Sequence, residues 1–180
     1  MTDCELTIVS LYPRDMNIYG DRGNVLALTR RAIAQGFSPR VVEVNPGDPM
    51  PESVDIVVGG GGQDSGQGRV ALDLGVRADE IRALASGGVP MLMICGLYQL
   101  FGHRFVTHQG EELTGIGVLD VETLGGTDRM IGNILLDTSE LGDISGYENH
   151  SGATQLGPGW RPLPRPVPGA GTAPGAGFCG

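Results

Sequence analysis

The sequence contains no lysine, and all 12 of its basic residues are arginines. The chain therefore has neither the phosphate-binding lysine of a P-loop nor an amine for a Schiff base, which excludes both kinds of site. Cysteine is scarce as well: the three cysteines stand at positions 4, 95 and 179, and no CxxC spacing occurs. This number and spacing argue against a disulfide framework and against a zinc ribbon.

Long hydrophobic runs are also missing. No apolar run approaches the ~20 residues that a membrane span requires, and the N-terminus lacks the basic region and apolar stretch of a secretory signal. We therefore expect a cytoplasmic protein with no transmembrane segment. The formal net charge of −9 argues against a nucleic-acid partner, because phosphate backbones attract basic surfaces.

The first hundred residues alternate strand-like apolar segments with helical ones. The pattern predicts strands over 4–12, 38–45, 54–62 and 89–94, and helices over 25–35, over one segment around 74–86, and from 96 onwards. The strand at 89–94 is almost wholly apolar, as is typical of a central parallel strand. This alternation predicts an α/β protein with an open, mostly parallel, flavodoxin-like sheet and helices on both faces.

The second half has a different pattern. Four segments, 104–115, 117–126, 128–138 and 143–152, are predicted to form short strands joined by turns. From residue 157 the chain contains seven glycines and six prolines in 24 residues, a composition typical of disorder. We expect a domain over 1–156 that is incomplete at its C-terminal end, followed by a disordered tail over 157–180.

The stretch "MLMICGLYQL" (91–100) combines an apolar strand, a cysteine, a glycine and a new helix. A nucleophile elbow has this order, because the turn that presents the nucleophile needs small neighbours. The positive end of the following helix favours the thiolate of Cys95, and the N–H of Gly96 is placed to stabilise an oxyanion. The alternative is a buried structural cysteine at the end of a strand.

A glycine-rich loop, "GGGGQD" (59–64), follows the third predicted strand. Ligands of open parallel sheets bind beyond the carboxyl ends of the strands, which is also where Cys95 should lie. Glycines there allow backbone amides to approach a substrate, and we expect Gly60 and Gly61 to join Gly96 in an oxyanion hole. The alternative is an ordinary mobile loop. Neither GxGxxG nor GxxxxGK[ST] can be fitted to it, which argues against a nucleotide site.

Five segments in order, "LYPRDMNIYGDRGN" (11–24), "GGGGQD" (59–64), "MICGLYQLFG" (93–102), "TDRMIGNILL" (127–136) and "GYENHSG" (146–152), resemble a known family. It is the cobyric-acid-synthase-like branch of the class I glutamine amidotransferases, and within it the glutaminase subunits of lipid II isoglutaminyl synthases. The resemblance implies that Cys95 is the nucleophile that forms a glutamyl thioester and that Arg129 binds the substrate glutamine. A guanidinium group suits the α-carboxylate of that substrate.

The resemblance also implies a partner. Such a subunit forms a heterodimer with a Mur-ligase-type synthetase subunit and supplies it with ammonia for ATP-dependent amidation of the D-glutamate in the lipid II stem peptide, a step of peptidoglycan synthesis. ATP and any metal are then expected on the partner, and no cofactor is expected on this chain. A cobyrinate-type amidotransferase is the alternative within the family.

The sequence departs from the family at the general base, a histidine expected in a late "YLHG"-like segment. His103 and His108 follow the elbow too closely to match it, and His150, in "ENHSG", has a different family counterpart. A base is needed to make the thiolate and to protonate ammonia. One alternative is therefore a catalytically inactive binding subunit, and another is a truncated or frameshifted gene product. A third is that His150 acts as a substitute base.

Overall fold

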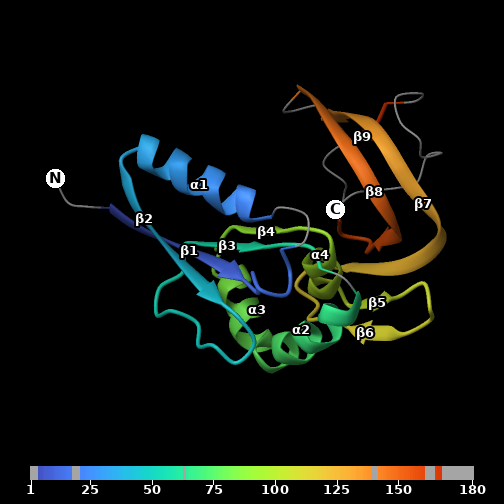
Figure 1. Ribbon diagram of the computed structural model, residues 1–180, viewed down its shortest axis with the longest axis horizontal. Coiled ribbons are helices and arrows are strands. Elements are labelled where there is room, and N and C mark those ends of the chain that lie inside the picture. Colours follow the sequence, from blue (N-terminus) through green and yellow to red (C-terminus); the bar gives the residue numbers. More distant parts are fainter. Residues whose placement is uncertain (1–3, 18–20, 63, 139–141, 161–164, 168–180) are drawn as a thin grey trace.

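The computed structural model describes residues 4–17, 21–62, 64–138, 142–160 and 165–167. Within these ranges the chain forms two sheets in sequence, a parallel one followed by a mostly antiparallel one (Figure 1). None of the described helices combines the length and hydrophobicity that a membrane span requires.

The first sheet has four parallel strands in the order β2-β1-β3-β4. They are β1 (Cys4–Leu11), β2 (Phe37–Val44), β3 (Ile56–Gly59) and β4 (Met91–Met93). Leu11 pairs with both Val44 and Gly59, and Gly59 pairs with Met93, so all four carboxyl ends lie level. The predicted parallel sheet is confirmed. The loops that follow these strands consequently meet at one edge.

The apolar composition of β4 suggested a central strand, but the structure places β4 elsewhere. It lies at an edge of the four-stranded sheet. Met93 packs into the core, whereas Leu92 on the opposite face is exposed. An apolar run therefore indicated a buried strand without fixing its position in the sheet, because position depends on pairing with distant segments.

Helices cover both faces of this sheet, as predicted (Figure 1). Helix α1 (Arg22–Ala34) places Val25 against Ile8 and Val58. Helices α2 (Asp64–Val76) and α3 (Ala78–Ser86) cover the other face, where Leu74 and Ile81 pack. The strands alternate accordingly, because successive residues of a strand point to opposite faces.

The single helix expected around 74–86 is in fact these two helices, separated at Arg77. That residue leaves helical geometry, with φ −96° and ψ 11°. Its N–H still donates to the carbonyl of Asp73, and its side chain donates to the carboxylate of Asp73 and to the carbonyl of Asp48. The helical period continues across the interruption, so apolar spacing alone did not reveal it.

The second sheet has the strand order β6-β5-β7-β8, with β9 also paired to β7. Its strands are β5 (Arg104–Val106), β6 (Glu112–Thr114), β7 (Val121–Thr138), β8 (Gly142–Leu156) and β9 (Arg165–Pro166). The prediction of a short strand at both 117–126 and 128–138 was wrong, because these segments form the single 18-residue strand β7.

The glycines that suggested a turn have another role in β7. The pairing of β7 with β8 is irregular between Gly125 and Met130, as at a β-bulge, which bends a strand without ending it. A Cβ on Gly125 would lie 2.5 Å from the backbone N of His108. Glycine is therefore required there for close backbone approach, and the irregular segment holds Arg129.

Most of the predicted tail, 161–164 and 168–180, lies outside the described residues. Of the rest, Arg165 and Pro166 pair with β7 as β9, and the N–H of Val167 donates to the carbonyl of Leu135. The disorder expected for 157–180 stays a prediction. The domain boundary at 156 stays a prediction.

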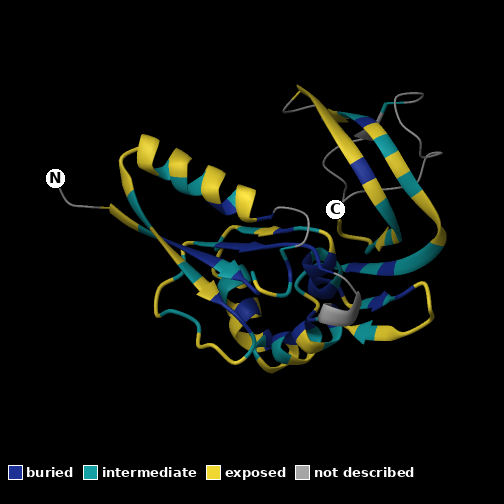
Figure 2. Ribbon diagram, viewed as in Figure 1, coloured by how far each residue is buried: buried dark blue, intermediate teal, exposed yellow. Residues whose placement is uncertain are grey.

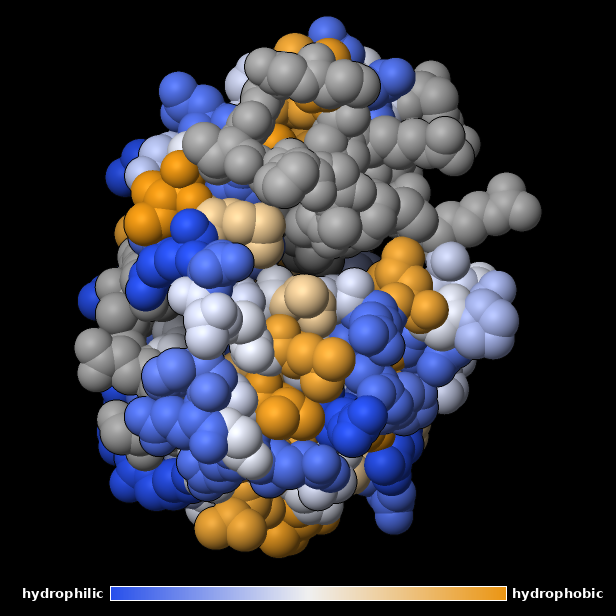
Figure 3. Space-filling view, turned by 90° about the vertical axis from the view of Figure 1, so that its right-hand side faces the viewer, coloured by the Kyte–Doolittle hydropathy of each residue, from blue (hydrophilic) through white to orange (hydrophobic). Residues whose placement is uncertain are grey.

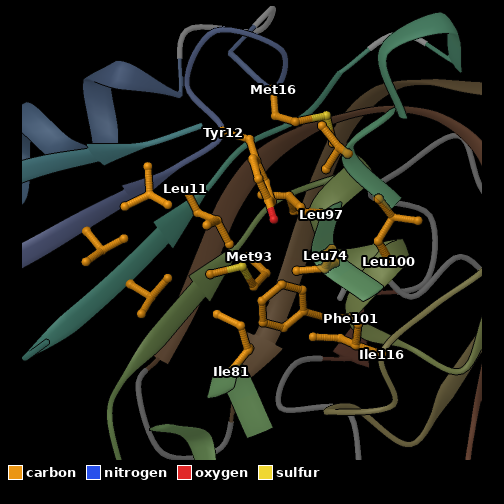
Figure 4. Close-up of a cluster of buried hydrophobic side chains, with 14 of the residues drawn as sticks. Leu11, Tyr12, Met16, Leu74, Ile81, Met93, Leu97, Leu100, Phe101 and Ile116 are labelled. Atoms are coloured by element: carbon orange, nitrogen blue, oxygen red, sulfur yellow. The ribbon is translucent and has the colours of Figure 1, made fainter. Parts of the chain in front are cut away.

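The main hydrophobic core lies between the parallel sheet and helices α2, α3 and α4 (Gly96–Phe101) (Figures 2 and 4). Leu97, Leu100 and Phe101 of α4 are all buried in it. Because the core holds α4 from one side, it also fixes the residue directly before α4, which is Cys95.

Candidate active site

Cys95 lies between β4 and α4 in a backbone conformation that side chains rarely adopt. Its φ is 51° and its ψ is −110°, and among the described residues only Tyr12 is another non-glycine residue with positive φ. Strain of this kind persists where the surrounding structure enforces it and is common at active sites. Cys95 is also exposed. The geometry therefore fits the predicted nucleophile elbow and does not fit a buried structural cysteine.

The glycine loop packs directly against this elbow. The N–H of Ile94 donates to Gly59 O (2.9 Å), and the N–H of Leu97 donates to Gly60 O (3.3 Å). A Cβ on Gly96 would lie 3.3 Å from the backbone N of Gly62 and 2.6 Å from Nε2 of Gln67. The amides of Gly62 and Gly96 thus lie close together beside Cys95.

The expected oxyanion-hole residues Gly60 and Gly61 do not line the cavity at Cys95. The N–H of Gly61 donates to Oδ2 of Asp21 (3.0 Å) in a buried contact, so it is directed at that carboxylate. Gly60 lines a separate cavity of about 220 Å³ with Asp21 and Arg22. From the glycine loop, Gly62 lines the cavity that contains Cys95.

The cavity at Cys95 has a volume of about 350 Å³ and lies between the two sheets' loops. Arg129 lines it from the irregular part of β7, where its Nε donates to Oδ1 of Asn149 on β8 (2.8 Å). The structure therefore brings together Cys95 and Arg129, which are 34 positions apart in the printed sequence. The role of Arg129 as a glutamine-binding residue stays a prediction.

The three histidines lie in two places. Ring atom Nε2 of His103 is 2.9 Å from Oδ1 of Asp120, at a separate hollow. His108 and His150 both line the Cys95 cavity. Sequence spacing placed neither of them there, because β5 and β8 bring them to the site only through their pairing with β7.

Two glutamines of the cavity wall were also missed. Gln99 lies one helical turn after Cys95 on α4, a spacing that places residues on one helix face and could have indicated it. Gln67, on α2, is buried, and its Nε2 donates to the carbonyl of Gly62 at 3.4 Å. No local pattern pointed to Gln67.

The loop after β1 is held in place by hydrogen bonds to Asp73. The hydroxyl of Tyr12 donates to Oδ2 of Asp73 (2.7 Å), and the N–H of Gly47 donates to its Oδ1 (2.8 Å). Burial opposes the charge of Asp73, but these bonds and the one from Arg77 outweigh it and hold the pKa of that carboxyl below its usual value. Burial raises the pKa of the Tyr12 hydroxyl far above its usual range, which keeps it a donor.

This network anchors the segment that carries Met16. The N–H of Met16 donates to the carbonyl of Tyr12 (2.8 Å), and the Met16 side chain packs where Gly62 and Gly96 have no Cβ. In the same loop, Asp15 accepts a hydrogen bond from Arg69, and Asn17 accepts one from the N–H of Arg22. Through Met16, this loop therefore packs against both the glycine loop and the turn at Cys95.

The described residues contain no group of three or more His, Cys, Asp or Glu side chains placed to hold a metal ion. The expectation that ATP and any metal belong to a partner is not tested by this and stays a prediction.

A family model described as the CobB/CobQ-like glutamine amidotransferase domain matches residues 7–174. The chain belongs to this family. The fold fits it: a chain from the solved structure of PurLQS from Thermotoga maritima superposes with a TM-score of 0.62 at 17% identity, over 94% of this chain and 77% of that chain. At this identity the likeness concerns the fold alone.

This amidotransferase chain is similar to two curated lipid II isoglutaminyl synthase (glutamine-hydrolyzing) subunits GatD. It is 36% identical to the one from Staphylococcus aureus, over 83% of this chain and 62% of the relative. It is also 36% identical to the one from Streptococcus pneumoniae, over 93% and 65%. The cobyric acid synthase of Pelotomaculum thermopropionicum is 33% identical, over 71% of this chain and 27% of the relative. The chain spans somewhat under two thirds of the GatD length.

Proposed function

We propose that this chain is a glutaminase subunit that releases ammonia from glutamine. The observation that carries the proposal is one cavity lined by both Arg129 and the exposed Cys95 of a strained turn, with the amides of Gly62 and Gly96 beside Cys95. Glutamine fits this arrangement, because it offers a carboxamide carbon to a thiolate and an α-carboxylate to a guanidinium group.

In the proposed reaction the Cys95 thiolate attacks the carboxamide carbon, and the carbonyl oxygen becomes an oxyanion. The N–H groups of Gly96 and Gly62 stabilise that charge, while the N–H of Gly61 holds the loop through Asp21. The C–N bond then breaks, and the departing amine takes a proton and leaves as ammonia. The remaining glutamyl thioester is hydrolysed by water to glutamate, which regenerates the thiol.

The base is the open element of this proposal. His150 is the first residue to test, because it lines the cavity and its Nε2 lies 3.6 Å from Oε2 of the buried Glu148. If it does not serve, this chain is a binding subunit that docks without hydrolysing glutamine.

The proposed acceptor of the ammonia is the D-glutamate of the lipid II stem peptide, amidated with ATP by a Mur-ligase-type partner. The similarity to GatD, which covers most of this chain and 62% of the S. aureus relative, supports this acceptor. A cobyrinate-type acceptor is less well supported, because the chain matches only 27% of that cobyric acid synthase.

The test is ammonia and glutamate release by the chain co-expressed with a Mur-ligase-type partner. Cys95→Ala should abolish release. Cys4→Ala is the matched control, because Cys4 is also an exposed cysteine but begins β1, at the end of the sheet away from the cavity, and it should leave release unchanged.

A second readout makes the result independent of the base. A glutamine analogue with a diazoketone in place of the carboxamide should label the wild-type chain and Cys4→Ala, but not Cys95→Ala. Labelling without ammonia release, with the partner still co-purifying, would support the binding-subunit alternative. Release that persists in Cys95→Ala would contradict the proposed nucleophile.

A further inference from the structure

His150 and Glu148 form a pair on strand β8 that the proposed chemistry does not yet explain. They are two residues apart, which places them on one face of the strand. The side chain of Glu148 is fully buried, and that of His150 is 24% exposed at the cavity wall. Oε2 of Glu148 lies 3.6 Å from Nε2 of His150.

The second ring nitrogen of His150 also faces an oxygen. Its Nδ1 lies 3.1 Å from the carbonyl oxygen of Gly152. A carbonyl only accepts hydrogen bonds, so Nδ1 carries a proton in this arrangement. A neutral ring would then turn the lone pair of Nε2 towards the carboxylate of Glu148. A ring protonated at both nitrogens would instead place a positive charge 3.6 Å from Oε2 of Glu148, which is within ion-pair distance but too long for a hydrogen bond.

Such an imidazolium would be a poor general base, since it has no lone pair to accept a proton, but it would supply a fixed positive charge. Strand pairing places that charge next to the predicted glutamine-binding residue. His150 pairs with Met130, the neighbour of Arg129, and Asn149 accepts a hydrogen bond from Nε of Arg129. The hairpin of β7 and β8 therefore brings the side chains of Arg129 and His150 to one cavity.

We propose that His150, charged and oriented by Glu148, is a substrate-binding residue that joins Arg129 in holding the α-carboxylate of glutamine. The inference rests on the proposed function and assigns His150 a role other than the base. Glu148 is a positioning residue, since it acts through His150. The other titratable groups of the cavity, Cys95 and His108, lie on separate elements.

The test measures binding in the full chain with Cys95→Ala, so that no turnover occurs and no base is needed. Two ligands are compared by calorimetry: L-glutamine, and L-glutamine whose α-carboxylate is converted to a carboxamide. His150→Gln should weaken glutamine binding by about tenfold, which corresponds to about 1.4 kcal/mol, and should leave binding of the carboxamide ligand unchanged. Glu148→Gln should act in the same direction.

Two further variants sharpen the result. His150→Arg retains a positive charge but cannot act as a base, so it should keep glutamine binding within about threefold of the parent, a difference under 1 kcal/mol. His103→Gln is the matched control, because His103 also pairs with a carboxylate, that of Asp120, outside this cavity. It should change neither ligand's affinity.

Several outcomes would overturn the inference. Equal loss for both ligands would mean that His150 serves structure alone, and no loss in His150→Gln would remove it from the binding site. In the chain with Cys95 restored, loss of ammonia release in His150→Arg with intact binding would make it the base instead. Failure of the unsubstituted Cys95→Ala chain to bind glutamine would contradict the proposed function, which is a separate result.

Discussion

At the scale of single residues, the site depends on Gly96, because a side chain there would collide with its neighbours. A Cβ on Gly96 would lie 2.6 Å from Nε2 of Gln67 and 2.8 Å from Cε of Met16. Both atoms end flexible side chains, but the backbone N of Gly62 is also only 3.3 Å away. A methyl group at position 96 would therefore displace the two amides proposed to stabilise the oxyanion.

We predict that Gly96→Ala slows labelling of Cys95 by the diazoketone analogue by at least about tenfold, because small displacements of reacting groups have large effects on rate. It should also lower the free energy of unfolding by about 1–3 kcal/mol through overpacking. Gly68→Ala is the control, since a Cβ there meets nothing within 4 Å. Labelling of Gly96→Ala at the wild-type rate would contradict this role for the glycine.

At the scale of elements, Asp73 joins three parts of the fold. It accepts hydrogen bonds from Tyr12 after β1, from Gly47 between β2 and β3, and from Arg77 at the junction of α2 and α3. Its pKa is lower in the folded chain than in the unfolded chain. Its contribution to stability is therefore fully present above its unfolded pKa and is lost as the pH falls through the folded pKa.

We predict that Asp73→Asn lowers the free energy of unfolding by about 1–3 kcal/mol at pH 7. The difference from the wild type should shrink as the pH falls below about 4, where the wild-type carboxyl also takes up a proton. Urea unfolding at pH 7 and at pH 3 measures both values. Asp79→Asn serves as control, because Asp79 also pairs with an arginine of its own helix region but is fully exposed. A difference that stays constant with pH would show that the charge of Asp73 is not involved.

At the scale of the whole molecule, α4 and the residues after it join the two sheets. The N–H of Leu119 donates to the carbonyl of Phe101 (2.9 Å), and that of His103 to the carbonyl of Val121 (2.8 Å). Leu97 packs against Gly59 of the parallel sheet. On the face of the molecule shown in Figure 3, hydrophobic residues lie in groups among hydrophilic ones.

We predict that Leu97→Ala lowers the free energy of unfolding by about 2–5 kcal/mol, as is usual for a buried leucine. The fluorescence of Trp160, the single tryptophan, reports on the region after β8, and circular dichroism reports on the whole chain. Both transitions should shift together. Leu72→Ala should have little effect, because Leu72 is 77% exposed on α2. A shift in circular dichroism alone would mean that the two sheets unfold separately.

The fold of the first half followed from local pattern. Alternating apolar segments and glycine-terminated helices predicted the parallel sheet with helices on both faces, and the order strand–cysteine–glycine–helix predicted the strand–turn–helix that the structure has at Cys95. These features depend on residues within a few positions of one another. The sequence alone therefore determined them, together with the family resemblance that the comparisons confirm.

The tertiary structure decided what depends on distant pairing. It joined two expected strands into β7 and placed β4 at an edge. It directed the N–H of Gly61 to Asp21, 40 positions away. It also brought His108 and His150 to the Cys95 cavity. Periodicity records which face a residue occupies, whereas register and loop packing decide which distant residue it meets, and those are fixed only when the chain is folded.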